Sequence, residues 1–275
     1  MLELPESQTL ARQLRETLAG KTIARAAANT APHGFAFYHG DPKEYGALLN
    51  GKTVTDAQAY GGRVEMTAGD AGLIFNDGVN ARLYLAGEKL PTKHQLLLTF
   101  TDGTALVCTI QMYGGLYAFV KAPAGDFYDA VAREKPSPLT GSFDEAYFEK
   151  LLAEAKQTLS AKAFLATEQR IPGLGNGVLQ DMLFEARIHP KTKLSALSER
   201  QKADLFRAVK HTLASMTEKG GRDTEKDLFG QPGGYPCLLS KNTLNRPCPA
   251  CGGAIIRQAY LGGNIYFCPH CQVEQ

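Results

Sequence analysis

Apolar positions in the first half of the chain repeat first with a helical period and then with a strand-like period. Within residues 1–20, leucines recur every four residues, at Leu10, Leu14 and Leu18, which predicts one N-terminal helix. From residue 22 to residue 120, short β-prone runs alternate with turn pairs such as Asn50-Gly51. We therefore expect an antiparallel β-sandwich or barrel behind the first helix.

A helical pattern returns in the second half. Segment 121–138 is typical of a linker, and four apolar-periodic stretches then predict helices over 143–156, 161–168, 176–185 and 198–219. Residues 220–245 are rich in glycine and polar groups, which favours loops. The fold class is therefore α+β, with three expected domains: a β-sandwich with a leading helix over 1–125, a helical domain over 138–245, and a cysteine hairpin over 246–275.

Composition limits the class of protein further. The 275 residues are 44% hydrophobic, which supports a packed core and excludes global disorder. No apolar run approaches the roughly 20 residues of a membrane span, and acidic residues stand where a signal peptide carries basic ones, so a cytoplasmic location is expected. The net charge of +2 is compatible with a nucleic-acid partner but does not identify one.

Four of the six cysteines form two tight pairs at the C-terminus. Cys248 and Cys251 form one Cys-x2-Cys pair, Cys268 and Cys271 form the other, and 16 residues separate them. This spacing suits one tetrahedral Zn²⁺, with a β-hairpin that turns at Gly262-Gly263 between the pairs. Because all four positions would be thiolates, no site stays open for water, and we expect a structural rather than a catalytic ion.

A glycine-rich loop precedes one of the predicted helices. The segment Ile171–Val178 reads IPGLGNGV, and glycines there allow close backbone approach, while helix N-termini hold anions such as phosphate. Asn176 can cap the helix or donate to a phosphate. Alone, the segment is equally typical of a plain glycine turn with an asparagine cap.

Together, these segments resemble the formamidopyrimidine-DNA glycosylase and endonuclease VIII family. Glu3-Leu4-Pro5-Glu6 is similar to its opening signature, Ile171–Pro190 to its helix–two-turn–helix motif, and the cysteine hairpin to its zinc finger. The resemblance covers nearly the whole chain. It implies a β-sandwich and a helical domain that hold damaged or abasic double-stranded DNA between them, with one structural Zn²⁺, in a protein that we expect to be monomeric.

The resemblance also implies an activity and its residues. A damaged base is flipped out and excised, and the abasic strand is cut by elimination. Glu3 corresponds to the catalytic acid, Glu6 to a second acid of the pocket, and Lys162 and Asn176 to phosphate contacts. The predicted enzyme is therefore a DNA glycosylase with abasic-site lyase activity.

Two departures from the family concern the nucleophile and a basic side chain. The family uses an N-terminal proline amine that attacks the sugar, but Leu2 stands here and favours retention of Met1. The Met1 amine remains a candidate nucleophile, displaced relative to Glu3 by roughly 3.5 Å of extended chain, which weakens its proximity advantage. Arg63 replaces a family lysine and can bind phosphate but cannot act as a proton-transfer base.

Other departures lie on the DNA-contacting surface. Where the family fills the gap left by the flipped base with a methionine and an Arg-x-Phe pair, the chain order gives Val79, Gln111 and Tyr113. Tyr113 is either a wedge between base pairs or a strand core aromatic. In the zinc hairpin, the family arginine falls on Gly263 with Asn264 beside it, so Arg257 and Lys241 either take over its phosphate contact or are solvated.

The loop 220–230 replaces a Gly-Gly-Ser/Thr segment near the family's lesion pocket, and it is unusually rich in charge, especially at 222–226. Three hypotheses therefore stay open. The chain is an active glycosylase and lyase, or a catalytically impaired protein that binds damaged DNA, or a protein that binds structured RNA with the same surface.

Overall fold

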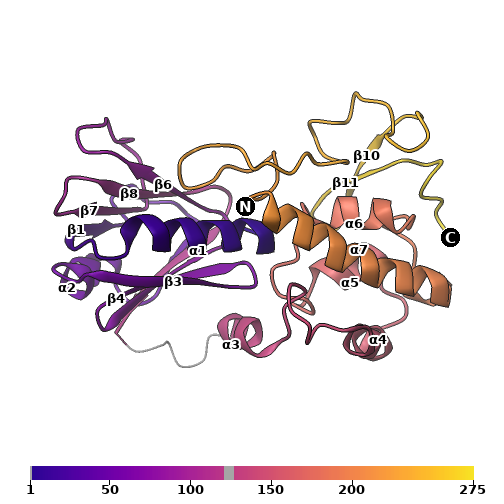
Figure 1. Cartoon of the computed structure of the whole chain (residues 1–275), viewed down its shortest axis with the longest axis horizontal. Coiled ribbons are helices and arrows are strands. Elements are labelled where there is room, and N and C mark those ends of the chain that lie inside the picture. The colour runs from indigo at the N-terminus through magenta and orange to yellow at the C-terminus, as the bar shows by residue number, and fades with distance from the viewer. Residues whose placement is uncertain (1, 121–126) are drawn as a thin grey trace.

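The computed structural model describes residues 2–120 and 127–275, which form a β-rich half and a helical half that lie side by side (Figure 1). Helix α1 (Leu4–Leu18) begins against the helical half and runs along the β-rich half (Figure 1). Its side chains enter both cores: Leu10 and Leu14 pack in the sandwich, whereas Leu4 packs among the helices. The predicted N-terminal helix is therefore confirmed, and it joins the two halves.

The β-rich half is a sandwich of two sheets, as expected. One has the strand order β1-β7-β8-β6 and the other β2-β9-β5-β4-β3. The strands are β1 (Ile23–Ala28), β2 (Ala36–Tyr38), β3 (Val54–Tyr60), β4 (Arg63–Ala68), β5 (Ala71–Asn76), β6 (Val79–Tyr84), β7 (Leu96–Phe100), β8 (Ala105–Ile110) and β9 (Gly114–Phe119). Pairing is antiparallel except between β2 and β9, which run parallel. A 3₁₀ turn (Pro42–Glu44) and helix α2 (Tyr45–Leu49) lie between β2 and β3 and were not predicted.

The helical half contains α3 (Phe127–Glu134), α4 (Glu145–Glu154), α5 (Ala161–Ala166), α6 (Leu179–Glu185), a 3₁₀ turn (Leu194–Ala196) and α7 (Glu199–Glu218). Helix α3 occupies part of the segment predicted as a linker. Helices α4, α5 and α7 lie within a few residues of the predicted spans, whereas α6 begins three residues later than Asn176. Helices α4, α5 and α7 each begin with a side-chain N-cap. The capping side chains of Asp144, Ser160 and Ser198 accept backbone N–H groups of the first turn.

The C-terminal hairpin consists of β10 (Ile256–Tyr260) and β11 (Gly263–Phe267). Its turn is Leu261-Gly262, one residue earlier than predicted, because Gly263 already pairs with Tyr260. Both turn residues have positive φ, 47° and 71°. The hairpin packs on α6, where the Gln180 side chain accepts the Tyr266 N–H at 3.0 Å.

The loop 220–230 crosses back from the helical half to the sandwich. Leu228 is fully buried in the sandwich core, and its carbonyl accepts the N–H of Leu83 at 2.9 Å. A residue of the predicted helical domain thus completes the β core. Among residues 2–120 and 127–275, no helix has the length and apolar character needed to cross a bilayer.

Candidate DNA-binding cleft and zinc centre

A cleft of about 570 Å³ separates the two halves. Residues from both sides line it, including Leu2, Glu3, Arg63, Asp77, Met112, Tyr113, Lys162, Asn176 and Gly263. Predicted DNA-contacting and catalytic residues from distant parts of the sequence therefore line the same cleft.

Glycines at the floor of the cleft let the two halves touch through their backbones. A Cβ on Gly173 would lie 2.5 Å from the Gly61 carbonyl carbon and 2.7 Å from the Gly62 nitrogen. Gly61 and Gly173 also have positive φ, 56° and 84°. The close backbone approach predicted for the IPGLGNGV loop is therefore, in part, an approach to the turn between β3 and β4.

The backbone of Leu2 is fixed at this floor. Its N–H donates to the Asp77 carbonyl at 2.7 Å, and its side chain belongs to the sandwich core. Met1 precedes Leu2 in the sequence, so the Leu2 nitrogen is a peptide amide, and its one N–H forms the hydrogen bond to the Asp77 carbonyl. Met1 itself, the predicted nucleophile, lies outside the described residues.

Glu3 lies beside Leu2 and is almost fully buried, at 3% exposure. Its carboxylate accepts the N–H groups of Gly177 at 2.9 Å and Val178 at 2.7 Å, just before α6 begins. Burial raises the pKa of Glu3 above that of an ordinary carboxyl group, although Arg222 and these two N–H groups act against the rise. Glu3 thus lies at the edge of the cleft, where burial makes its carboxyl group easier to protonate than an exposed one.

Arg222 connects the two predicted acids, which sequence reasoning did not foresee. Its Nε and Nη2 donate to the two Glu6 oxygens at 2.9 and 2.8 Å, its backbone N–H donates to Glu6 Oε1 at 3.1 Å, and Nη1 lies 3.6 Å from Glu3 Oε2. Burial alone would raise the pKa of Glu6, but Arg222 outweighs it and lowers that pKa. Glu6 is therefore an ionised partner of Arg222, buried away from the residues that line the cleft.

Several predicted DNA contacts lie in the cleft. Arg63 and Lys162 line it from opposite halves, and the Lys162 Nζ donates to the Tyr260 carbonyl at 2.5 Å. Burial lowers the pKa of Lys162. Tyr113 is 45% exposed in the β8–β9 turn and faces the cleft, so the core-aromatic alternative for it is wrong. Val79 is buried in the sandwich core and is not among the described residues that line the cleft.

Four predicted DNA contacts differ from expectation in their partners or their position: Asn176, Asn264, Gln111 and Arg257. The Asn176 side chain donates to the Asn264 carbonyl at 2.9 Å and does not cap α6, whose N-cap is Val178. Arg257 donates to the Asn264 side chain at 3.1 Å on the exposed face of the hairpin. Gln111 is exposed, but neither it nor Arg257 is among the described residues that line the cleft.

Met112 was missed at the sequence level. It is 68% exposed, lines the cleft beside Tyr113, and has φ of 64°. An exposed methionine in a left-handed turn conformation costs both apolar burial and backbone energy, which is typical of a residue kept for contact with a ligand. The signal available in the sequence was the run of apolar and aromatic residues directly before Gly114-Gly115.

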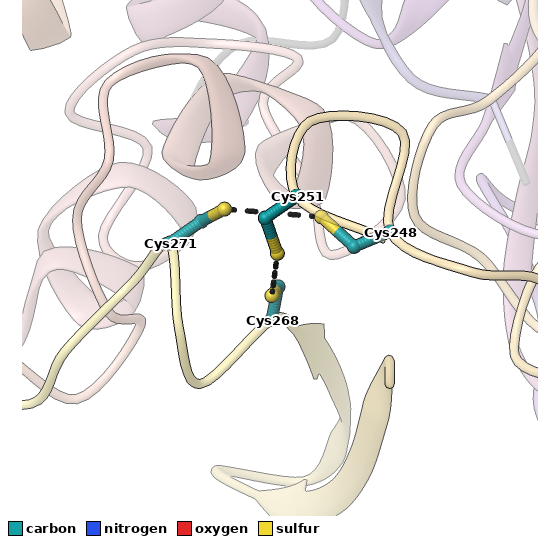
Figure 2. Close-up of side chains that lie close together, drawn as sticks. All are labelled: Cys248, Cys251, Cys268 and Cys271. Atoms are coloured by element: carbon teal, nitrogen blue, oxygen red, sulfur yellow. Dashed lines mark hydrogen bonds between the residues drawn. The ribbon is translucent and has the colours of Figure 1, made fainter. Parts of the chain in front are cut away.

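The four C-terminal cysteines converge on one point, as Figure 2 shows. Their sulfur atoms lie within 4.8 Å of one another, with 3.8 Å between Cys248 and Cys271 and 3.4 Å between Cys251 and Cys268. A tetrahedron with Zn–S bonds of about 2.3 Å has edges of about 3.8 Å, so the thiols fit Zn²⁺. The cluster is a structural zinc site, because four thiolates leave no coordination position for water.

The zinc site also supports the cleft. The hairpin strand between the two cysteine pairs supplies the Asn264 carbonyl, which the side chains of Asn176 and Gln180 both contact, at 2.9 and 3.1 Å. A Zn²⁺ ion bound by the four cysteines would thereby hold the start of β11, including Gly263, against the loop that leads into α6.

Comparison with known proteins agrees with this architecture. Residues 1–115 match the family model for the formamidopyrimidine-DNA glycosylase N-terminal domain, and residues 135–227 match the model for the H2TH domain of the same glycosylase. The formamidopyrimidine-DNA glycosylase of Cytobacillus firmus is 30% identical, over 99% of this chain and 100% of its own length. That of Thermus thermophilus is 28% identical, over 100% of this chain and 99% of its own length.

Solved structures share the fold at 24% identity. The Thermus thermophilus protein has a TM-score of 0.81 over 99% of each chain. The Lactococcus lactis protein, in complex with N7-benzyl-Fapy-dG DNA, has a TM-score of 0.84 over 99% of this chain and 100% of its own. Two matched domains in the family's order, together with a relative at 30% identity over the full length, lead to one conclusion: the chain belongs to the formamidopyrimidine-DNA glycosylase family.

Proposed function

We propose that this protein is a base-excision-repair enzyme that acts on damaged sites in double-stranded DNA, as a DNA glycosylase with abasic-site lyase activity. The observation that carries the proposal is the cleft, which brings Glu3 together with Lys162 and Arg63 from opposite halves of the molecule. A relative that this chain matches over its full length is named formamidopyrimidine-DNA glycosylase, and matched Lactococcus lactis structures contain Fapy-dG or abasic-site DNA.

Each cleft residue has a role in this proposal. Lys162 and Arg63 contact phosphates, which fixes the register of the duplex without reading its sequence. Met112 and Tyr113 enter the base stack next to the lesion. The zinc hairpin contributes Asn264 and, on its outer face, Arg257. We infer that Glu3, whose burial favours the protonated form, gives its proton to the deoxyribose ring oxygen as the sugar opens.

Strand cutting needs an amine. A primary amine adds to the C1′ aldehyde of the opened sugar and water leaves, which forms an imine. Loss of the C2′ proton then expels the 3′ phosphate, and water hydrolyses the imine and returns the amine. The proposed amine is that of Met1, because the Leu2 nitrogen is a peptide amide that donates a hydrogen bond to the Asp77 carbonyl.

A second candidate is a protein that binds damaged DNA with little chemistry. The Arg222 ion pairs favour it, because a guanidinium that lies against both acids opposes their protonation. Either candidate is compatible with the cytoplasmic location and the monomeric state expected from the sequence. The location and the monomeric state remain predictions.

Borohydride trapping on abasic-site duplex DNA separates the candidates. We expect the parent protein to form a covalent adduct at a reduced rate, Leu2→Pro to raise the rate if it permits removal of Met1, and Glu3→Gln to lower it. Blocking the terminal amine by acetylation should abolish the adduct. Robust adduct formation by the acetylated protein would show that another residue is the nucleophile, whereas tight binding without any adduct would favour the second candidate.

A further inference from the structure

Strand β2, together with the residue before it, carries two exposed phenylalanines at the edge of the five-stranded sheet. Ala36 and Tyr38 pack against the sandwich core, so the alternation of side chains along a strand turns Phe35 and Phe37 outward. These two side chains are 63% and 50% exposed. Large aromatic side chains that are exposed next to each other are typical of a binding surface.

The pairing of β2 with β9 places both rings beside the cleft. The two strands run parallel, with Phe37 opposite Gly115. The Gly114 N–H donates to the Phe35 carbonyl at 3.0 Å, which ties the start of β2 to the start of β9. Two residues before the Phe37–Gly115 pair stand Phe35 on one strand and Tyr113 on the other. Opposed residues of neighbouring strands share a face of the sheet, so Phe35 and Phe37 lie on the face of Tyr113.

Two tyrosines continue this face into the cleft. A Cβ on Gly115 would lie 2.5 Å from Tyr117 Cζ, so the Tyr117 ring covers the place where Gly115 lacks a side chain, next to Phe37. Tyr117 and Tyr113 both line the cleft. The exposed face formed by Phe35 and Phe37, here called the β2 surface, is therefore an outward continuation of the cleft wall.

The chain around the β2 surface lacks acidic residues. Residues 30–40 contain no aspartate or glutamate, and His33 and His39 flank the two phenylalanines. The His33 ring packs edge-on against Phe35, with 6.5 Å between the ring centroids. A surface without carboxylates does not repel a phosphate backbone, so its composition suits a nucleic-acid strand that follows the cleft wall outward.

The position of the rings decides which form of nucleic acid can use them. In a continuous duplex each base is paired and stacked between its neighbours, so its flat face cannot reach a side chain on the outside of a sheet. An unpaired base exposes that face. Stacking of unpaired bases on aromatic side chains is a general way of binding single strands, and it does not depend on the base sequence.

We propose that the β2 surface binds an unpaired base of the DNA strand that leaves the cleft beside Tyr113. The proposal rests on the proposed function and adds a structural context to it. The damaged site would be held in the cleft, while nucleotides next to it, unpaired as in a bubble, would stack on Phe35 and Phe37. Damaged sites in locally opened DNA would then be preferred over the same sites in continuous duplex.

Competition binding with two DNAs tests this preference. Both carry the same tetrahydrofuran abasic analogue, one in continuous duplex and one beside a bubble of unpaired thymines. We expect the parent protein to bind the bubble DNA about tenfold more tightly, because each stacked base adds to the affinity. Joint replacement of Phe35 and Phe37 by alanine should reduce the ratio of the two affinities to less than about threefold. The matched control is Phe229→Ala, at a phenylalanine that is 49% exposed in the loop 220–230, and it should keep the parent ratio.

A tryptophan at the β2 surface reports stacking directly. The chain contains no tryptophan, so Phe35→Trp introduces the only one and keeps an aromatic ring at this position. Its emission should be quenched when the bubble DNA binds and unchanged when the continuous duplex binds. Phe229→Trp serves as the control and should respond equally to both DNAs.

Each other result contradicts a different statement. Equal affinity of the parent for the two DNAs, or equal quenching of the Phe35→Trp emission by both, would overturn the proposal and leave the proposed function standing. A preference that survives in the double alanine variant would assign it to the flexibility of the DNA and overturn the role of the β2 surface. A parent dimer that the double alanine variant loses in sedimentation would assign the surface to a second copy of the chain. Failure of the parent to distinguish the analogue from undamaged duplex, with selective tryptophan quenching intact, would contradict the proposed function alone.

Discussion

Replacing Arg222 by methionine should destabilise the fold strongly. Methionine keeps much of the side-chain length but leaves Glu6, 8% exposed, without the cation that contacts both of its oxygens. Breaking a buried ion pair from one side costs about 3–5 kcal/mol of unfolding free energy. At roughly 2–4 °C per kcal/mol for a chain of somewhat smaller size, the melting temperature should fall by about 6–20 °C.

A double-mutant cycle separates this ion pair from general packing. Urea unfolding of the parent, Arg222→Met, Glu6→Gln and the double variant should give a coupling free energy of about 2–3 kcal/mol, since the double variant removes both partners of this pair together. A control with Arg207→Met, on the exposed face of α7, should change the unfolding free energy by about 0.5 kcal/mol or less.

The same cycle has an expected pH dependence. Arg222 lowers the pKa of Glu6 in the folded state, so the pair contributes its stability above the ordinary carboxyl pKa of 4.5 and loses it as the pH falls through the lower folded-state value. In Arg222→Met, the main cause that lowers the pKa of Glu6 is absent, so burial raises that pKa and Glu6 takes up a proton more readily. The difference between parent and variant should therefore narrow from pH 7 towards pH 4. A difference that stays constant over this range, or a coupling near zero, would refute the ion-pair reasoning.

Three further predictions concern the cleft and the metal. Elemental analysis should find one zinc per chain, and Cys271→Ser should release it and weaken DNA binding; a folded hairpin without zinc would contradict the assignment. Lys162→Ala should reduce the slope of log affinity against log salt by about one, whereas Lys202→Ala, on the surface of α7, should not. Tyr113→Ala should weaken binding of abasic-site DNA about tenfold, and equal loss in Leu85→Ala, another exposed apolar residue, would argue against a wedge.

Features that depend on local spacing were predictable from the sequence. The cysteine pairs specify their own metal geometry, and the leucine period of α1 specifies a helix wherever the rest of the chain lies. The strand-and-turn alternation likewise predicted the sandwich. Helix α3 was missed because the polar composition of 121–138 hides a short apolar period, and the parallel pairing of β2 with β9 leaves no local trace.

The site was harder to predict because its decisive contact is not local. Arg222 and Glu6 are 216 positions apart, and a charged residue in a glycine-rich loop is usually solvated. Similarly, Asn176 has the sequence position of a helix cap, yet its side chain donates to Asn264, 88 residues away. Tertiary contacts of this kind decide the role of a polar side chain, and periodicity carries no information about them.

Leu4 packs in the core of the helical half and Leu228 packs in the core of the sandwich. This crossing determines whether the protein can be divided into two fragments that fold alone. Each half holds a segment whose chain neighbours belong to the other, so residues 1–125 expressed alone would lack Leu228 and residues 138–275 alone would lack Leu4. Neither fragment carries a complete interior, which makes the molecule a poor candidate for splitting or for domain transplantation. The backbone contacts of the glycines at the cleft floor hold the two halves at a fixed distance. The width of the cleft is therefore a property of the intact fold.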